Sequence, residues 1–247
     1  MKSGFLDRRG DLRSPLARLD ARAKLVGIFL AVVILASEPA GALDPFPLYF
    51  GLILALAVAA GASPALLAKR ALAASPFILA AAALPLTAAL IGDGDWRSSG
   101  GFAASILLRA YGSILLLTLL IAVTEFPDLL DALRRLRAPA SLALVTALMY
   151  RYVFLLLEEW RRLSQARDCR SAGRLRLSRA SVYGKQIGLT LVRSWERSER
   201  VHAAMTVRGF KGELPLAHHG RFTVADALFA SVVPAAFLAV RLIPAWR

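Results

Sequence analysis

Five apolar stretches, each long enough or nearly long enough to cross a bilayer, constrain this chain more than any other feature. A hydrocarbon core about 30 Å thick needs roughly 20 apolar residues when it is crossed by a helix. The stretches are Leu25–Ala36, which can be extended to Leu43, then Leu48–Ala62, Ala71–Ile91, Phe102–Val123 and Phe222–Ile243. The first two are short, so we expect a pair of tilted spans. The sequence therefore predicts an all-α membrane protein with about five transmembrane helices.

The charge of the chain separates it from other basic proteins. It has 31 Lys plus Arg against 17 Asp plus Glu, a formal net charge of +14, yet 57% of its residues are hydrophobic. A soluble nucleic-acid-binding protein can be as basic but does not carry bilayer-length apolar stretches, so we expect no nucleic-acid partner. The single thiol, Cys169, excludes an internal disulfide.

Basic residues also predict the orientation, because loops rich in Lys and Arg stay in the cytoplasm. Residues 126–221 hold 18 of the 31 basic residues, and the arm 1–24 and the pair Lys69 and Arg70 are basic as well. All three belong on the cytoplasmic side, with the N-terminus inside. No convincing cleavage site follows the first apolar run, so we expect that run to be retained as a span and not removed as a signal peptide.

A sixth apolar run, Leu142–Leu157, has 16 residues and contains Arg151. As a span it would place the following basic residues outside, so we predict a helix packed under the membrane part or lying at its surface. The segment Phe126–Leu136 before it has amphipathic helical spacing and ends ahead of Pro139. Beyond it, Ile187, Leu191 and Trp195 recur on one helical stripe, and we expect Trp160 and Trp195 to fill helix contacts.

Three regions follow from this pattern. They are an N-terminal arm with four transmembrane helices in 1–124, a cytoplasmic module of amphipathic helices in 125–221, and a last transmembrane helix in 222–247.

Several segments, among them Leu19–Leu25, Ala166–Ser171 and Ala203–Phe210, carry short motifs of one known family. They resemble the transmembrane coupling subunits (T components) of energy-coupling factor (ECF) transporters. The resemblance is closest to the CbiQ type used in cobalt uptake. The segment Leu19–Leu25 is similar to the family's opening "L-D-P-R-x-K-L", with Ala21 in place of proline. The other matching segments are Met149–Phe154, Glu158–Glu159, Ala166–Ser171, Arg193–Val201 and Ala203–Phe210.

The resemblance implies a non-catalytic scaffold in a bacterial inner membrane, without a cofactor and without catalytic or metal-binding residues. Its cytoplasmic coupling helices would dock into a pair of ABC-type ATPase subunits. ATP-driven motion would then pass to a substrate-binding membrane subunit, a CbiM-like S component, for cobalt or nickel uptake. The sequence agrees in one respect: it has no G-x-x-x-x-G-K-[ST] motif, so the energy must come from a partner. We also expect the basic module to contact membrane lipid.

The same resemblance implies which residues contact the ATPases. The second of the family's two Ala-Arg-Gly-like motifs falls on Arg208 and Gly209. The first falls on Ala166–Ser171, where Arg167 or Arg170, followed by Ser171, is the candidate. Both arginines remain candidates from sequence. A guanidinium with five donors in a rigid fork suits docking against acidic groups or carbonyls.

Other functions remain open. One alternative is the T component of a vitamin importer, and another is a self-contained secondary transporter, although the spans are almost bare of polar groups apart from Arg109. Arg109 lies seven residues into a predicted span, where it either has a pairing role or snorkels to the interface. A membrane enzyme would gather more acidic or histidine residues at one face. His218 and His219 lack supporting ligands, so we expect no metal site there.

Overall fold

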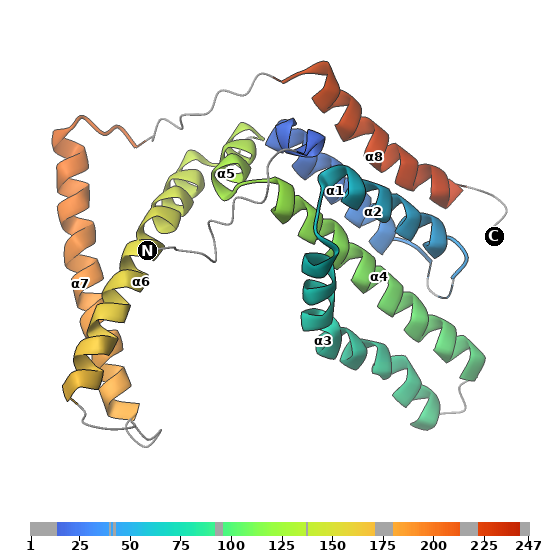
Figure 1. The fold of residues 1–247 in the computed structure, drawn as a ribbon, viewed down its shortest axis with the longest axis horizontal. Coiled ribbons are helices and arrows are strands. Elements are labelled where there is room, and N and C mark those ends of the chain that lie inside the picture. Colours follow the sequence, from blue (N-terminus) through green and yellow to red (C-terminus); the bar gives the residue numbers. More distant parts are fainter. Residues whose placement is uncertain are drawn as a thin grey trace. The chain divides into compact units, whose positions relative to one another are not determined.

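The computed structural model describes residues 14–39, 41, 43–91, 96–136, 138–170, 180–212 and 222–242, and every regular element within these ranges is a helix. The chain divides into two compact units. Helices α6 (Ala140–Arg170) and α7 (Ala180–Val207) form one unit, which we call the hairpin (Figure 1). The other unit, the body, contains η1 (Pro15–Arg18), α1 (Ala21–Ala36), α2 (Phe46–Ala60), α3 (Pro64–Ile91), α4 (Trp96–Val123), α5 (Phe126–Arg135) and α8 (Val224–Leu242).

The prediction of an all-α membrane protein is confirmed. Within the described ranges, four helices contain segments long and apolar enough to cross a membrane: Pro64–Thr87, Ser99–Val123, Ser141–Cys169 and Val224–Leu242. Helices α1 and α2, with 16 and 15 residues, are shorter than the roughly 20 residues of an untilted span. Helix α3 contains Pro76 and Pro85 and is visibly bent in Figure 1, as expected where proline removes backbone hydrogen bonds.

Local sequence signals set several helix ends. The side chain of Asp20 caps α1 by accepting a hydrogen bond from the Arg22 amide at 3.0 Å. Helix α2 ends at Gly61, whose φ of 62° is a left-handed conformation that favours glycine. Helix α5 carries Asp128 in its first turn and basic residues in its last, which matches the helix dipole.

The core of the body is apolar and draws on α1, α2, α4 and α8. Helix α1 packs along α8, and α3 packs along α4. Tyr49 is fully buried, stacks on Phe237 with ring centroids 5.4 Å apart, and donates a hydrogen bond to Glu38. The core side chains are Ile28, Ala31, Leu35, Phe46, Tyr49, Ile53, Ala57, Ala60, Leu116, Leu119, Val123, Val233, Phe237 and Val240.

The segments that the sequence places in the cytoplasmic module 125–221 are divided differently in the structure. The apolar run Leu142–Leu157 and the polar stretch after it form one continuous helix, α6, of 31 residues. Its length and composition also meet the requirement for a span, so its place under or at the membrane stays a prediction. Helix α5, which the sequence grouped with the module 125–221, packs against α1 in the body.

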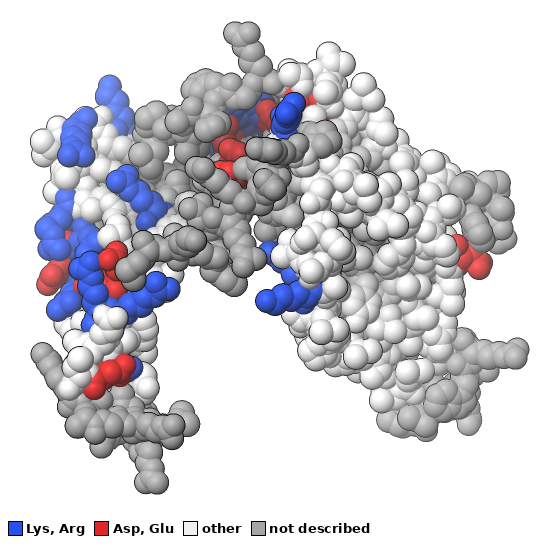
Figure 2. Space-filling view, in the orientation of Figure 1, with Lys and Arg blue, Asp and Glu red and all other residues white. Residues whose placement is uncertain are grey.

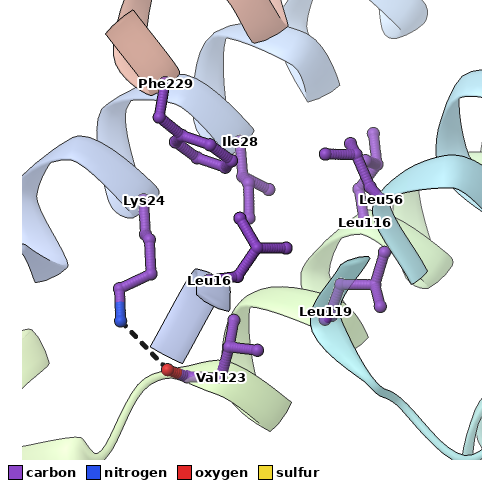
Figure 3. Close-up of a pocket in the computed structure, with 9 residues that line it drawn as sticks. Leu16, Lys24, Ile28, Leu56, Leu116, Leu119, Val123 and Phe229 are labelled. Carbon is purple, nitrogen blue, oxygen red and sulfur yellow. Dashed lines mark hydrogen bonds between the residues drawn. The ribbon is translucent and has the colours of Figure 1, made fainter. Parts of the chain in front are cut away.

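The Leu19–Leu25 segment forms a buried polar cluster, which we call the α1 anchor, with Asp226 of α8. The Lys24 ammonium, in a residue only 2% exposed, donates to the carbonyl oxygen of Val123 at 3.0 Å (Figure 3) and of Ala17 at 3.3 Å. Asp226, also 2% exposed, accepts from the Asp20 amide at 2.7 Å and from the Thr223 amide and hydroxyl at 2.7 and 2.6 Å.

The α1 anchor joins three helices at one end of the body. Lys24 ties the start of α1 to the last residue of α4, and Asp226 ties it to the first turn of α8. Beside the Lys24 stem, Leu16, Ile28, Leu116 and Phe229 line part of a small apolar cavity (Figure 3). Helix α5 begins at Phe126, three residues after Val123. The α1 anchor therefore fixes the point where α4 ends and the chain passes into α5.

Candidate functional site

Helix α7 ends in a Schellman motif centred on Arg208 and Gly209. The Phe210 amide donates to the Met205 carbonyl and the Gly209 amide to the Thr206 carbonyl, both at 3.0 Å. Gly209 has a φ of 80°, the left-handed conformation that this motif requires after the helix. Arg208 is thereby the capping residue of α7, and it is exposed. A cation at this position also interacts favourably with the negative end of the helix dipole.

We therefore expect Gly209 to be needed for the geometry of this turn. Gly209→Val should weaken the turn by about 1–2 kcal/mol, because an L side chain is strained at positive φ. Gly209→Asn should have a smaller effect, since asparagine tolerates this conformation. Amide hydrogen exchange at Gly209 and Phe210 measures the result. Equal protection in the glycine, asparagine and valine proteins would contradict this role.

Polar contacts hold the two helices of the hairpin together, and Arg167 is at their centre. Its Nη1 donates to the side-chain oxygen of Gln186 at 2.9 Å, and its guanidinium lies 4.7 Å from the ring centroid of Tyr183. Its Nε and Nη2 donate to Asp168 at 3.0 and 2.9 Å. With these contacts the Arg167 side chain is 18% exposed.

Gln186 extends the same set of contacts. This residue is 7% exposed, and its amide nitrogen donates to the Ser164 hydroxyl at 2.8 Å and to the Trp160 carbonyl at 3.4 Å. Further along, Glu159 accepts from Arg193 and Arg197 of α7, each at 3.3 Å. We call the contacts of Glu159, Ser164 and Arg167 with Tyr183, Gln186, Arg193 and Arg197 the polar seam.

Because the seam is polar, the apolar side chains of α7 face elsewhere. Ile187, Leu191 and Trp195, which the sequence places on one stripe, are 50%, 63% and 69% exposed. The prediction that Trp195 fills a helix contact is wrong within the described chain, since its indole nitrogen instead donates to Glu199 at 3.0 Å. Trp160 is partly buried, as expected.

The structure brings the predicted docking residues to different environments. Arg167 is engaged in the seam, whereas Arg208 is exposed beside Gly209 at the end of α7. Arg170 is the last residue of α6, its side chain is not among those described, and Ser171 lies outside the described residues. Gln186 is a contact residue that the sequence analysis did not identify. The sequence offers little to mark it, since it is a single amide side chain one turn after Tyr183 in a helix of mixed composition.

The hairpin carries many basic side chains. Figure 2 shows Lys and Arg gathered over α6 and α7, while the displayed side of the body carries few charges. In the part of the chain that the structure describes, no three His, Cys, Asp or Glu side chains gather as a metal site would require. His218 and His219 lie outside the described residues.

Comparison with known proteins shows to which family the chain belongs. The sequence profile of the CbiQ family, described as cobalt transport protein, matches residues 13–218. Cobalt transport protein CbiQ of Rhodobacter capsulatus is 31% identical over 112 residues, 45% of this chain and 46% of that protein. A putative fused cobalt transport protein CbiMQ of Methanocorpusculum labreanum is 24% identical over 222 residues, 83% of this chain. The matches span 46% and 36% of the lengths of these two relatives. The chain belongs to the CbiQ family of cobalt transport proteins.

Proposed function

We propose that this chain is the transmembrane coupling subunit of an ECF-type ABC importer. In this role it transmits the ATP-driven motion of partner ATPase subunits to a substrate-binding membrane subunit, with cobalt as the first candidate ion and nickel as the second. The chain itself carries out no catalysis. The observation that carries the proposal is the hairpin of a CbiQ-family protein, whose α7 ends at an exposed arginine held at a fixed turn.

Arg208 is the docking residue of the second motif in this proposal. It is exposed, and the hydrogen bonds of the Schellman motif fix its backbone. An exposed guanidinium on a fixed backbone can enter a partner's groove and bind a carboxylate or carbonyl groups without reorganising its own helix.

For the first motif, the seam favours Arg170 over Arg167. The Arg167 guanidinium already has Gln186, Asp168 and the ring of Tyr183 as partners, so docking would require these contacts to break. Arg170 is three residues further along α6, close to its end. In this proposal Arg170 docks, and Arg167 positions it by holding α6 against α7.

The seam also supplies the mechanical link between the two docking ends. Arg167 and Gln186 join the helices near the end of α6, and Glu159 joins them again through Arg193 and Arg197. Because two separated points are tied, the helices resist sliding past each other. A displacement of either docking end by an ATPase would therefore move the hairpin as a unit.

The partners follow from the same proposal. They are ABC-type ATPase subunits and a CbiM-like substrate-binding membrane subunit. The fused relative from Methanocorpusculum labreanum supports the second partner, because its name joins CbiM and CbiQ in one protein. The test is purification of the tagged chain from native membranes in mild detergent, with identification of every protein by mass.

Recovery of ATPase subunits together with a membrane protein, and ATP-dependent Co²⁺ uptake by vesicles containing that set, would support the proposal. Uptake assays with Ni²⁺ and with vitamins then identify the substrate. Recovery of the chain alone, stable and without ATPase activity, would overturn it.

A pair of variants distinguishes the roles of Arg167 and Arg170. Arg170→Glu should reduce recovery of the ATPase subunits at least tenfold. Arg167→Met should lower stability by about 2 kcal/mol, because it removes charged hydrogen bonds and a cation–π contact. Gln186→Leu should resemble Arg167→Met, and the double variant should be less destabilised than the sum of the two, since both residues share one contact.

The unfolding temperature and the recovery of the ATPase subunits are measured for each of these four variants. A loss of ATPase recovery in Arg167→Met that Gln186→Leu does not share would assign docking to Arg167 instead.

A further inference from the structure

Both chain connections between the hairpin and the long helices of the body begin or end at the α1 anchor. The outgoing connection starts at Val123, the last residue of α4, and passes through α5 into α6. The returning connection runs from the end of α7 to Thr223, directly ahead of α8. Lys24 binds the first of these two points, and Asp226 binds the second.

Lys24 holds the end of α4 to the start of α1. The last carbonyl groups of an α-helix have no partner within the helix, and the buried Lys24 ammonium donates to one of them, the Val123 carbonyl, at 3.0 Å. It also donates to the Ala17 carbonyl at 3.3 Å, just ahead of α1. Helix α5, which follows α4, packs against α1 as well. A displacement of α5 therefore acts on α1 through two sets of contacts.

Asp226 holds the start of α8 to the start of α1. Its Oδ2 accepts from the Thr223 amide at 2.7 Å and from the Thr223 hydroxyl at 2.6 Å. Its Oδ1 accepts from the amide of Asp20, the residue that caps α1, at 2.7 Å. Because this carboxylate is buried, a shift of α8 against α1 would leave a buried charge with fewer donors, which is costly.

Helix α1 packs closely on both of the helices that the anchor joins to it. An added Cβ at Gly27 would lie 3.5 Å from the Cα of Ala230 in α8. On α4, an added Cβ at Gly112 would lie 2.7 Å from the Leu35 side chain of α1. Close-packed interiors have low compressibility and transmit strain. A displacement of α1 at the anchor is therefore passed along α4 and α8.

We propose that the α1 anchor is the point at which motion of the hairpin enters the long helices of the body, with Lys24 and Asp226 as positioning residues. This inference rests on the proposed function, because it requires a hairpin that the ATPases move. The anchor ties both connections to one helix, so that they displace α1 together. Without it, the motion would be absorbed at the ends of α4 and α8, since helix ends open at little cost.

The test uses two variants in the complete complex with ATPases and substrate-binding subunit. Lys24→Met keeps the length of the stem and removes the ammonium, and Thr223→Val removes only the hydroxyl that binds Asp226. Both should retain all subunits and hydrolyse ATP within twofold of the unsubstituted rate. Co²⁺ uptake per ATP hydrolysed should fall at least fivefold in Lys24→Met and at least twofold in Thr223→Val. Thr223→Ser retains the hydroxyl and should restore normal uptake.

Two measurements separate this role from a loss of stability. Phe237→Leu removes a buried ring beside Tyr49, so it should lower the unfolding temperature but leave uptake per ATP unchanged. Amide hydrogen exchange is then compared with and without a non-hydrolysable ATP analogue. The analogue should change exchange in both α7 and α1 of the unsubstituted complex, and in α7 only when Lys24 is replaced by methionine.

Normal uptake per ATP in both Lys24→Met and Thr223→Val would overturn the inference. An equal loss of uptake per ATP in Phe237→Leu would overturn it too, because the effect would then follow stability. The unsubstituted complex distinguishes the two proposals. If it showed no ATP-dependent Co²⁺ uptake, the proposed function would fail and this inference with it, whereas normal uptake by it and by both anchor variants would remove the inference alone.

Discussion

Reversal of one charge, Arg208→Glu, is expected to separate assembly from membrane insertion. Docked arginine side chains that pair with buried or acidic groups contribute about 2–5 kcal/mol to binding, so recovery of the ATPase subunits should fall at least about 30-fold. Insertion should be unaffected, because Arg208 is exposed and its backbone turn depends on Gly209. Co-purification of the ATPases and Co²⁺ uptake by vesicles measure the result.

A matched control lies on the same helix. Arg200→Glu reverses the charge of an exposed arginine two turns earlier, where its side chain is 3.9 Å from Glu196. Exposed pairs of this kind contribute only tenths of a kcal/mol, so recovery of the ATPases should change little. Arg208→Gln removes the charge without placing an acid at the negative end of the helix dipole. Normal assembly and uptake in both Arg208 variants would remove this residue from the mechanism.

The second large effect concerns stability. Asp226→Leu should destabilise the body by about 3 kcal/mol or more, because it removes the charged acceptor of three hydrogen bonds and leaves the amides of Asp20 and Thr223 and the Thr223 hydroxyl without it. For a chain of this size the unfolding temperature should fall by on the order of 10 °C. Asp226→Asn retains one acceptor oxygen, so its unfolding temperature should lie between those of Asp226→Leu and the unsubstituted chain. Thermal unfolding in detergent provides the measurement.

Glu196→Gln is the control for this prediction, since it removes an exposed carboxylate that lies beside Arg200. Its unfolding temperature should stay within about 1–2 °C of the unsubstituted chain. If Asp226→Leu and Glu196→Gln gave the same unfolding temperature, the α1 anchor would have no structural role.

The features that could be predicted from sequence are those that depend on neighbouring residues. The amphipathic helix at α5 follows from local spacing and from the charges at its two ends, and the body helices follow from apolar length. The environment of Arg208 is similarly local, because a glycine directly after it ends the helix.

The environment of Arg167 could not be predicted in the same way. Its main partner, Gln186, is 19 residues away on another helix, so the contact depends on how α6 and α7 pack. Trp195 illustrates the same limit. Its apolar stripe predicted a packed face, but the helices of the hairpin use polar groups for their contacts and leave that face open.

In the proposed importer, the apolar stripe of α7 would link the amount of this subunit to the amounts of its partners. Ile187, Leu191 and Trp195 together present a continuous apolar stripe outside the body's core, and surfaces of this kind promote aggregation when they stay uncovered. A copy made in excess of those partners would expose this stripe, and chaperones and proteases act on proteins that stay incompletely assembled. The polar seam would then link folding to quality control, because it joins α6 to α7 without covering this stripe, and in the proposed importer only a partner would cover it.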